Sequence, residues 1–302
     1  MSIRRFLLKL WLKNFEKPKL ATSSVEKLRR SFERMSRTFF RPPPGTIYDI
    51  VGMGDEANSV PTLTVMKPGK GPIILYFHGG GFVFGSPHTH RALAAWLSHY
   101  SGLKAALVSY RRAPEDPFPT ALIDGMIAYR FATRNKNGVI IGGDSAGGGL
   151  ALALLAEIKR KKLPMPLGTF AFSPVTDLSF SGNSIRDNAK ADVILPVERA
   201  GEMVDMYLNG ADPKDPRASP LFADFSGASP VWLAVSDTEI LLDDSLRLAE
   251  RLKEQGVSVT LVQEHDLPHV WPLFRGYLPE ADKTLRSVAD WIRSLSRPAA
   301  DS

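Results

Sequence analysis

Residues 139–158 read VIIGGDSAGGGLALALLAEI, and this stretch decides the fold. Its first three residues are a β-branched run typical of a buried strand, and residues 150–158 are a leucine- and alanine-rich run that favours a helix. The pentapeptide GDSAG at 143–147 lies between them and matches G-x-S-x-G, in which a serine stands on a tight strand-to-helix turn. Glycine is needed on both sides of that serine because a β-carbon would clash there. The stretch therefore predicts a strand, a sharp turn and a helix in succession.

Ser145 is the candidate nucleophile of this turn. The helix that follows has its N-terminus at the serine, and the positive potential there favours a developing oxyanion. The competing interpretation is a glycine-rich turn whose serine has no chemical role. The strand before the pentapeptide and the helix after it favour the catalytic interpretation, because the motif presents a nucleophile in that context.

A second glycine-rich loop, HGGG at 78–81, follows the apolar run at 73–77. Successive glycines allow backbone N–H groups to approach a ligand closely, so the N–H groups of Gly80 and Gly81, joined by that of Ala146, are the expected oxyanion donors. Glycine-rich loops also bind phosphates, but no Lys-Ser/Thr pair follows these glycines and the chain has no G-x-G-x-x-G. We expect His78 to hold the loop and not to act as the base.

The general base is expected to be a histidine near the end of the chain, because a serine on this kind of turn is followed in sequence first by its acid and then by its histidine. His265 and His269 both come after the strand expected at 258–263. His269 is the better candidate because it lies in the loop beyond that strand, whereas His265 is close to the strand end and is typical of a polar surface residue.

Apolar runs and amphipathic stretches alternate from residue 46 onward, which predicts an α/β protein with a mostly parallel sheet covered on both faces. The expected strands are 46–53, 61–66, 73–77, 105–109, 138–142, 168–173, 231–236 and 258–263. The expected helices between and after them are 88–101, 120–134, 146–162, 243–255 and 280–296.

Two segments depart from this alternation. Residues 3–15 have the spacing of an amphipathic helix, and a second helix is expected to start near Ser23, in a capping box with Glu26, and to end at the proline run 42–44. Residues 176–228 separate two strands by more chain than one helix needs and contain one expected helix near 197–208. We interpret 176–228 as an insertion over the sheet and not as a separate domain.

Composition limits the remaining classes. The 302 residues include no cysteine, which excludes disulfides, a thiol nucleophile and cysteine-ligated metal sites, and fits a cytoplasmic protein. The net charge is +6, but residues 1–41 hold twelve Lys or Arg and three Glu, a balance of +9. The basic character belongs to one segment, so it is weak evidence for nucleic-acid binding. We see no transmembrane span and no secretory signal, since Lys9 and Lys13 interrupt the apolar N-terminus.

Five motifs together resemble the bacterial hormone-sensitive-lipase family of esterases. They are HGGG at 78–81, YRRAPEDPFP at 110–119, GGDSAGG at 142–148, SPVTDL at 173–178 and His269-Val270-Trp271. The resemblance implies one α/β-hydrolase domain over 1–302, with an eight-stranded, mostly parallel sheet and a helical cap formed by 1–45 and 176–228. It also implies hydrolysis of carboxylic esters, usually with short acyl chains, without a cofactor or metal. An amidase or lactonase with the same triad is the main alternative, and a non-catalytic hydrolase-like binding module is another.

The acid of the triad is expected among the carboxylates of residues 237–244. Asp237 is the obvious candidate by residue type, but the family pattern places an apolar pair and then a carboxylate four residues after the acid. Glu239 satisfies that pattern with Asp243, and its separation from His269 is 30 residues, about what the family shows, against 32 for Asp237. We therefore favour Glu239, with Asp237 as a turn residue and with Asp243 and Asp244 capping the next helix.

Three further hypotheses concern the acyl chain of the substrate, the role of residues 1–45 and the oligomeric state. Bulky residues 82–84 beside the oxyanion loop favour short acyl chains if they narrow the site, and the competing interpretation is that they only pack in the core at the strand end. Residues 1–45 are expected to form a lid over the site, and the rival hypothesis is weak contact with a membrane surface through the basic N-terminal helix. Glu26 and Glu33 dilute the charge of the second helix, which favours the lid. We also expect a homodimer formed through the edge strand near 258–263, because that strand has unpaired backbone groups.

Overall fold

The computed structural model describes residues 2–67 and 71–295. Its centre is one eight-stranded sheet in the order β1-β2-β4-β3-β5-β6-β7-β8. Strands β1, β2 and β4 are paired antiparallel and all later pairs are parallel, so the predicted mostly parallel sheet is confirmed. The strands are β1 Tyr48–Gly54, β2 Ser59–Val65, β3 Ile73–Phe77, β4 Lys104–Val108, β5 Val139–Asp144, β6 Gly168–Phe172, β7 Val231–Ser236 and β8 Val259–Glu264.

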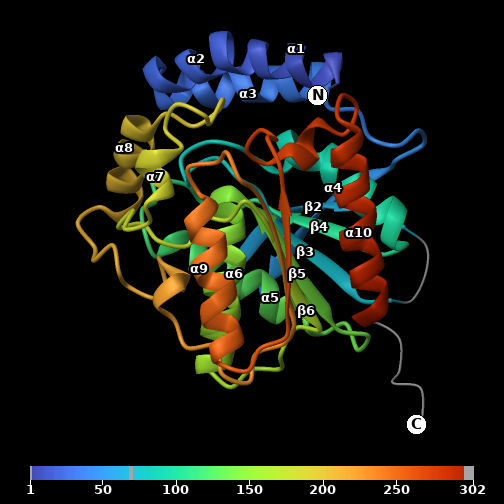
Figure 1. Ribbon diagram of the computed structural model, residues 1–302. Coiled ribbons are helices and arrows are strands. Elements are labelled where there is room, and N and C mark those ends of the chain that lie inside the picture. Colours follow the sequence, from blue (N-terminus) through green and yellow to red (C-terminus); the bar gives the residue numbers. More distant parts are fainter. Residues whose placement is uncertain (1, 68–70, 296–302) are drawn as a thin grey trace.

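Helices cover both faces of this sheet (Figure 1). Helices α4 and α10 pack on one face, and α5, α6 and α9 pack on the other. The helices of the described residues are α1 Ile3–Trp11, α2 Lys17–Thr22, α3 Val25–Phe39, α4 Pro87–Ser101, α5 Thr120–Ala132, α6 Ser145–Arg160, α7 Ser184–Asp187, α8 Val197–Leu208, α9 Leu242–Glu254 and α10 Pro279–Leu295. None of them combines the length and the apolarity that crossing a membrane requires.

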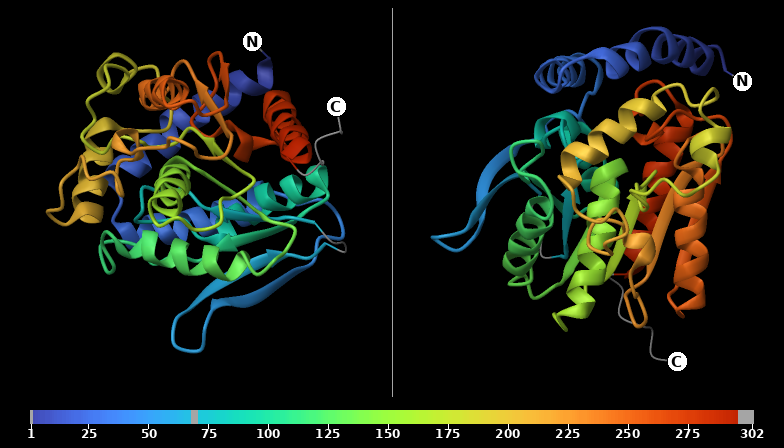
Figure 2. Two further views of the ribbon diagram at one scale, coloured as in Figure 1. Left: turned by 90° about the horizontal axis from the view of Figure 1, so that it is seen from below. Right: turned by 90° about the vertical axis from the view of Figure 1, so that its left-hand side faces the viewer.

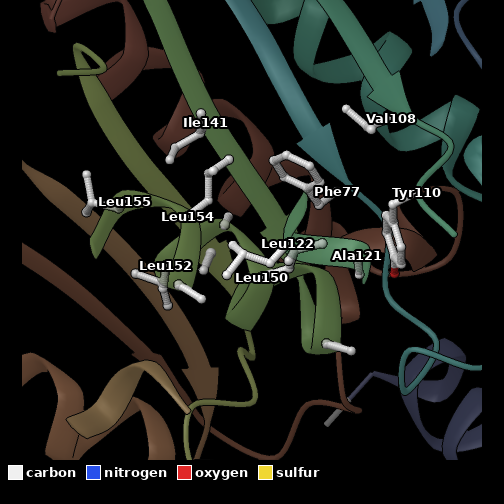
Figure 3. Close-up of a cluster of buried hydrophobic side chains, with 14 of the residues drawn as sticks. Phe77, Val108, Tyr110, Ala121, Leu122, Ile141, Leu150, Leu152, Leu154 and Leu155 are labelled. Carbon is white, nitrogen blue, oxygen red and sulfur yellow. The ribbon is translucent and has the colours of Figure 1, made fainter. Parts of the chain in front are cut away.

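The alternation of side chains along β3 divides the core into two clusters. Leu75 and Phe77 belong to the cluster under α5 and α6, and Ile74 and Tyr76 belong to the cluster under α4 and α10. This is the period of a strand that is buried on both faces. Figure 3 shows the first cluster, in which Phe77 lies beside the leucines of α6.

The N-terminal helices form a separate layer, drawn in blue at one end of the molecule in Figure 1 and in the side view of Figure 2. They lie over the carboxyl ends of the strands and contact the insertion 176–228. The Lys17 ammonium donates to the carbonyl oxygens of Ala189 and Asp192 at 2.9 and 2.6 Å. Arg199 of α8 donates to the carbonyl oxygen of Ser23 at 2.9 Å. Residues 1–45 and 176–228 are therefore neighbours.

Some local predictions are wrong. The cap of α3 is Ser24, whose hydroxyl accepts from the Lys27 N–H, because α2 runs to Thr22 and Ser23 ends it. The first helix does not stop at residue 15 but passes through a π-helical turn, Leu12–Glu16, into α2. Residue 296, the expected end of the last helix, lies outside the described residues.

Asp243 and Asp244 do not cap α9, which is a further correction. Both lie in its first turn, but their carboxylates accept from the insertion instead: Asp243 from Ser184 N at 3.0 Å, and Asp244 from the backbone N–H groups of Thr176 and Asp177 at 2.6 and 2.9 Å. The insertion supplies buried backbone donors that need partners, and these outweigh the local capping preference.

Strand β8 is an edge of the sheet, as expected. Its side chains are partly or fully exposed along its length. Dimerisation through this edge stays a prediction.

The core cluster around α6 predicts a clear stability difference between two substitutions. Leu154 is fully buried beside Phe77, whereas Ile123 on α5 is 48% exposed. Leu154→Ala should lower the free energy of unfolding by about 2–5 kcal/mol, because it removes buried methyl groups and leaves a cavity. Ile123→Ala should change it by less than about 0.5 kcal/mol. Urea unfolding of both variants measures this, and equal losses would contradict the assignment of the core.

Candidate active site

Ser145 stands at the junction of β5 and α6 with a positive φ of 51°, an unusual conformation for a residue with a side chain. The flanking glycines permit the turn, because a β-carbon on Gly143 would lie 2.4 Å from the Gly147 carbonyl oxygen, and one on Gly147 would lie 2.2 Å from the Phe77 carbonyl oxygen. The end of β3, which is the parallel neighbour of β5, therefore lies directly against the turn. This packing presents Ser145 at the carboxyl edge of the sheet, with the N-terminus of α6 behind it.

Ser145, His269 and Glu239 form one hydrogen-bonded line. The Ser145 hydroxyl is 2.9 Å from His269 Nε2, and His269 Nδ1 is 2.5 Å from Glu239 Oε2. The three side chains come from the ends of β5, β8 and β7, which lie together because parallel strands end at the same edge. Glu239 is 1% and His269 6% exposed, so water does not compete for these contacts.

Glu239 is held by contacts that leave one oxygen free for the histidine. Its Oε1 accepts from the Ser236 backbone N–H at 2.8 Å and from the Ser173 hydroxyl at 2.9 Å. Ser173, at the end of β6, also accepts from the Val270 N–H, so it links the acid to the histidine loop. Sequence reasoning missed this role of Ser173, although the residue lies in the SPVTDL motif at the end of a strand.

Glu239 raises the pKa of His269. Burial alone would lower the pKa of His269, but the hydrogen bond and the negative charge of Glu239 outweigh it and raise that pKa above its ordinary value. A buried histidine without such a partner would lose basicity. The contact with Glu239 thus makes His269 more basic than an ordinary histidine.

Asp237 and His265 form a different pair on the surface. His265 Nδ1 is 2.6 Å from Asp237 Oδ2, and the histidine side chain is 83% exposed. Asp237 also accepts from the Asp266 backbone N–H at 2.9 Å, as expected of a turn residue. The structure brings neither residue to Ser145.

The oxyanion loop has the backbone that the glycine run predicts. Gly80 and Gly81 both have positive φ, and a β-carbon on Gly80 would lie 2.2 Å from the Phe84 carbonyl oxygen. Within the described residues, the N–H groups of Gly80 and Gly81 donate to no protein acceptor. Ala146 is in the first turn of α6, where backbone N–H groups lack helical partners. The three donors are therefore available.

A buried carboxylate fixes this loop to the nucleophile turn, and the sequence did not reveal it. Asp144 Oδ1 accepts from the Gly79 N–H at 3.1 Å and from the Tyr76 hydroxyl at 2.7 Å, and Oδ2 is 3.2 Å from His90 Nε2. Burial alone would raise the pKa of Asp144, but the contacts with His90 and Tyr76 outweigh it and hold that pKa below its ordinary value. The sequence signal that could have revealed this role is the charged residue Asp144 at the first x position of G-x-S-x-G.

His78 has the supporting place expected of it. Its Nδ1 hydrogen-bonds the Gly79 carbonyl oxygen at 2.9 Å, and its ring stacks on Tyr110 with 4.3 Å between centroids. Burial, together with the neighbouring His90, lowers the pKa of His78 to about 3, so the ring is neutral at pH 7. A neutral ring that is 1% exposed suits a structural role.

An apolar cavity of about 180 Å³ lies between this site and the N-terminal layer. Ser145, His269 and the oxyanion loop form its floor, and side chains from α3 and α8 form its roof, including Leu28, Phe32 and Met203. Among the described residues, no group of three His, Asp or Glu side chains is arranged to hold a metal ion.

Comparison with known proteins identifies the family of this chain. A family model for the alpha/beta hydrolase fold matches residues 74–273. The chain belongs to this α/β-hydrolase family. An acetyl-hydrolase of Streptomyces hygroscopicus is 32% identical over 279 residues, which are 90% of this chain and 91% of that protein. An esterase of Acinetobacter venetianus is 36% identical over 227 residues, 74% and 75% of the two chains.

Solved structures of esterases superpose closely on this chain. The esterase EstE5, in a crystal soaked with p-nitrophenyl butyrate, superposes with a TM-score of 0.91 at 35% identity, over 98% of this chain and 99% of that chain. An esterase described as a member of the bacterial hormone-sensitive-lipase family superposes with a TM-score of 0.90 at 31% identity, over 98% and 99%. The predicted family and the class of carboxylic-ester hydrolase are thereby confirmed.

The Asp144 contacts predict that His90 positions the oxyanion loop of this hydrolase. His90→Gln should lower kcat by on the order of tenfold to a hundredfold with little change in KM, because a displaced oxyanion donor acts mainly on the transition state. His99→Gln, at an exposed position on the same helix, is the matched control. Steady-state kinetics with a soluble p-nitrophenyl ester measure both. A His90→Gln protein with normal kcat would show that the contact serves stability alone.

Proposed function

We propose that this hydrolase cleaves short-chain carboxylic esters through an acyl-enzyme on Ser145. The observation that carries the proposal is the continuous line from Ser145 through His269 to Glu239, set beside three free backbone donors. An amidase or lactonase could use the same line, and no contact in the site favours either of them over an ester hydrolase.

The mechanism follows from the positions of these groups. His269 Nε2 takes the proton of the Ser145 hydroxyl as its oxygen attacks the ester carbonyl. The N–H groups of Gly80, Gly81 and Ala146 stabilise the tetrahedral oxyanion. His269 then gives the proton to the leaving alcohol, and water repeats the cycle on the acyl-enzyme. Glu239 holds the Nδ1–H tautomer of His269 and stabilises its charged form.

The cavity supports an apolar substrate with a short acyl group. Phe82 and Phe84 line it beside the oxyanion loop, and both are held by other rings: Phe82 stacks on Tyr207, and Phe84 contacts Phe32 edge-on. Side chains fixed in this way limit the length that fits near the reacting carbonyl. A relative from Pseudomonas putida, 28% identical, is an ethyl acetate hydrolase, which agrees with small esters.

The N-terminal layer and the insertion together act as the cap of the site in this proposal. Val25 and Leu28 of α3 face inward and are buried, and Arg29 donates to the carbonyl oxygens of Val83 and Ala113 at 2.8 and 2.9 Å. The cap is thus fastened to the chain that follows the oxyanion loop. Its position over the cavity excludes bulk water from the oxyanion.

A panel of substrates tests the activity. Purified protein should hydrolyse p-nitrophenyl acetate and butyrate faster than the C12 and C16 esters, and should act poorly on a matched amide and lactone. Ser145→Ala should abolish turnover without unfolding, since no nucleophile remains, while Ser226→Ala at an exposed serine should retain it. Faster turnover of the amide or the lactone would replace this proposal with one of those activities.

Replacing each candidate carboxylate by its isosteric amide tests which of the two is the acid of the triad. Glu239→Gln should lower kcat by on the order of a thousandfold or more. His269 must be neutral to accept a proton, so its raised pKa predicts that activity falls as pH drops through a value above that of ordinary histidine. Because Glu239→Gln removes the contact that raises this pKa, the acid limb of kcat/KM should move to lower pH. Asp237→Asn should leave both kcat and the acid limb of kcat/KM unchanged. A larger loss of kcat in Asp237→Asn than in Glu239→Gln would identify Asp237 as the acid.

A further inference from the structure

Helix α1 presents an apolar side to solvent. Ile3, Phe6, Leu7 and Leu10 recur at three- and four-residue spacing, so they share one side of the helix. They are 79%, 51%, 56% and 48% exposed, respectively. The opposite side of α1 packs against the protein, and Leu12 of the following turn is buried there. A helix that packs by one side normally exposes polar residues on the other, so the outer side of α1 lacks an explanation from the fold.

Helix α3, in the same layer, presents a basic side to solvent. Lys27, Arg30, Arg34 and Arg37 are exposed and again recur at three- and four-residue spacing, while Val25 and Leu28 face the protein. Glu33 accepts from the Ser86 hydroxyl through Oε1, and its Oε2 lies 4.0 Å from the Arg37 guanidinium in an ion pair. Arg37 is therefore partly neutralised, and Lys27, Arg30 and Arg34 carry most of the positive charge on the outer side of α3.

The two sides form one surface. The rings of Trp11 and Phe39 meet at 5.9 Å between the helices. A groove lies between α3 and the chain from the end of α1 into α2, and its charged lining residues are Glu16, Lys19, Lys27, Arg30 and Arg34. Figures 1 and 2 show these helices as the outermost layer of the molecule. We call this surface the cap face and define it by Ile3, Phe6, Leu7 and Leu10 of α1 with Lys27, Arg30, Arg34 and Arg37 of α3.

The charge of residues 2–41 indicates which kind of partner binds the cap face. The exposed charged residues of positions 2–41 are one carboxylate, Glu26, and seven cations, which are Arg4, Lys13, Lys27, Arg30, Arg34, Arg37 and Arg41. A second copy of this chain would bring an equally positive surface against the first, which is repulsive. A surface with apolar side chains beside cations instead matches an anionic bilayer, whose acyl boundary takes the apolar groups and whose phosphates take the cations.

We propose that the cap face docks on anionic phospholipid membranes. The apolar side chains of α1 enter the boundary between headgroups and acyl chains, and the cations of α3 lie against the lipid phosphates. The protein is then a peripheral membrane protein with its cap toward the bilayer. This inference concerns the outer side of the cap and does not depend on the proposed chemistry inside it.

Vesicle sedimentation with the full-length chain tests the docking. Vesicles of phosphatidylcholine containing phosphatidylglycerol should bind the protein at least tenfold better than phosphatidylcholine alone, and salt should weaken the binding. Phe6→Ser/Leu10→Ser should lower the partition coefficient by on the order of tenfold or more, because two apolar anchors are lost. Arg30→Gln/Arg34→Gln should lower it by a similar factor on the anionic vesicles, because two cations are lost.

Matched controls place the same changes elsewhere. Ile50→Ser/Ile123→Ser removes two exposed apolar side chains, and Lys136→Gln/Lys253→Gln removes two exposed cations, all outside the cap. Both controls should bind as the unmodified chain does. Hydrolysis of a soluble p-nitrophenyl ester reports that each variant is folded, and binding is scored without turnover, so loss of one result does not imply loss of the other.

Three outcomes would overturn the proposal. The first is no binding to either vesicle. The second is binding that ignores phosphatidylglycerol or falls equally in the controls. The third is a dimer, seen by light scattering, that dissociates in Phe6→Ser/Leu10→Ser, which would assign the cap face to a second copy.

Discussion

The close approach of the end of β3 to the turn between β5 and α6 is the constraint on which the rest of the site depends. The Phe77 carbonyl oxygen would lie 2.2 Å from any β-carbon at position 147, so glycine is required there, and Ser145 takes a positive φ. Backbone strain of this kind persists where surrounding packing over-determines it. Here the packing is the fully buried core on both faces of β3 and β5. The candidate nucleophile Ser145 is thus held by the same contacts that hold the sheet.

Two buried carboxylates, Glu239 and Asp144, then hold the groups around Ser145 in place. Glu239 aims one oxygen at His269 and gives the other to Ser236 and Ser173, so its orientation is fixed before any substrate binds. Asp144 joins the turn to the oxyanion loop through Gly79. A buried charge is costly unless it is fully hydrogen-bonded, and both are. The cost of burial is offset by contacts that also set the geometry of the candidate site.

The proposed cap has two sides, an inner side against the cavity and an outer side toward solvent. Its inner side closes an apolar cavity and is fastened by Arg29 and Arg199 to the oxyanion loop segment and the insertion. Its outer side exposes apolar and basic groups that have no role in that closure. Lid and membrane contact, which were rival hypotheses for the N-terminal segment, are therefore compatible, because opposite sides of the same helices would serve them.

The sequence by itself determined the strand–turn–helix at 139–158, the order of strands and helices, and Ser145, His269 and the oxyanion glycines as candidates. These features are local: periodicity, glycine at sterically forced positions, and chain order carry them. For Glu239 against Asp237, residue type and register pointed in opposite directions. In the structure the two carboxylates leave β7 toward different partners, Glu239 toward His269 and Asp237 toward His265. Only the tertiary structure decided the places of Asp144, His90 and Ser173, the contact of Glu33 with Ser86, and the use of Asp243 and Asp244 by the insertion. Each of these depends on a partner more than 50 residues away in the chain, and local propensity contains no information about such a contact.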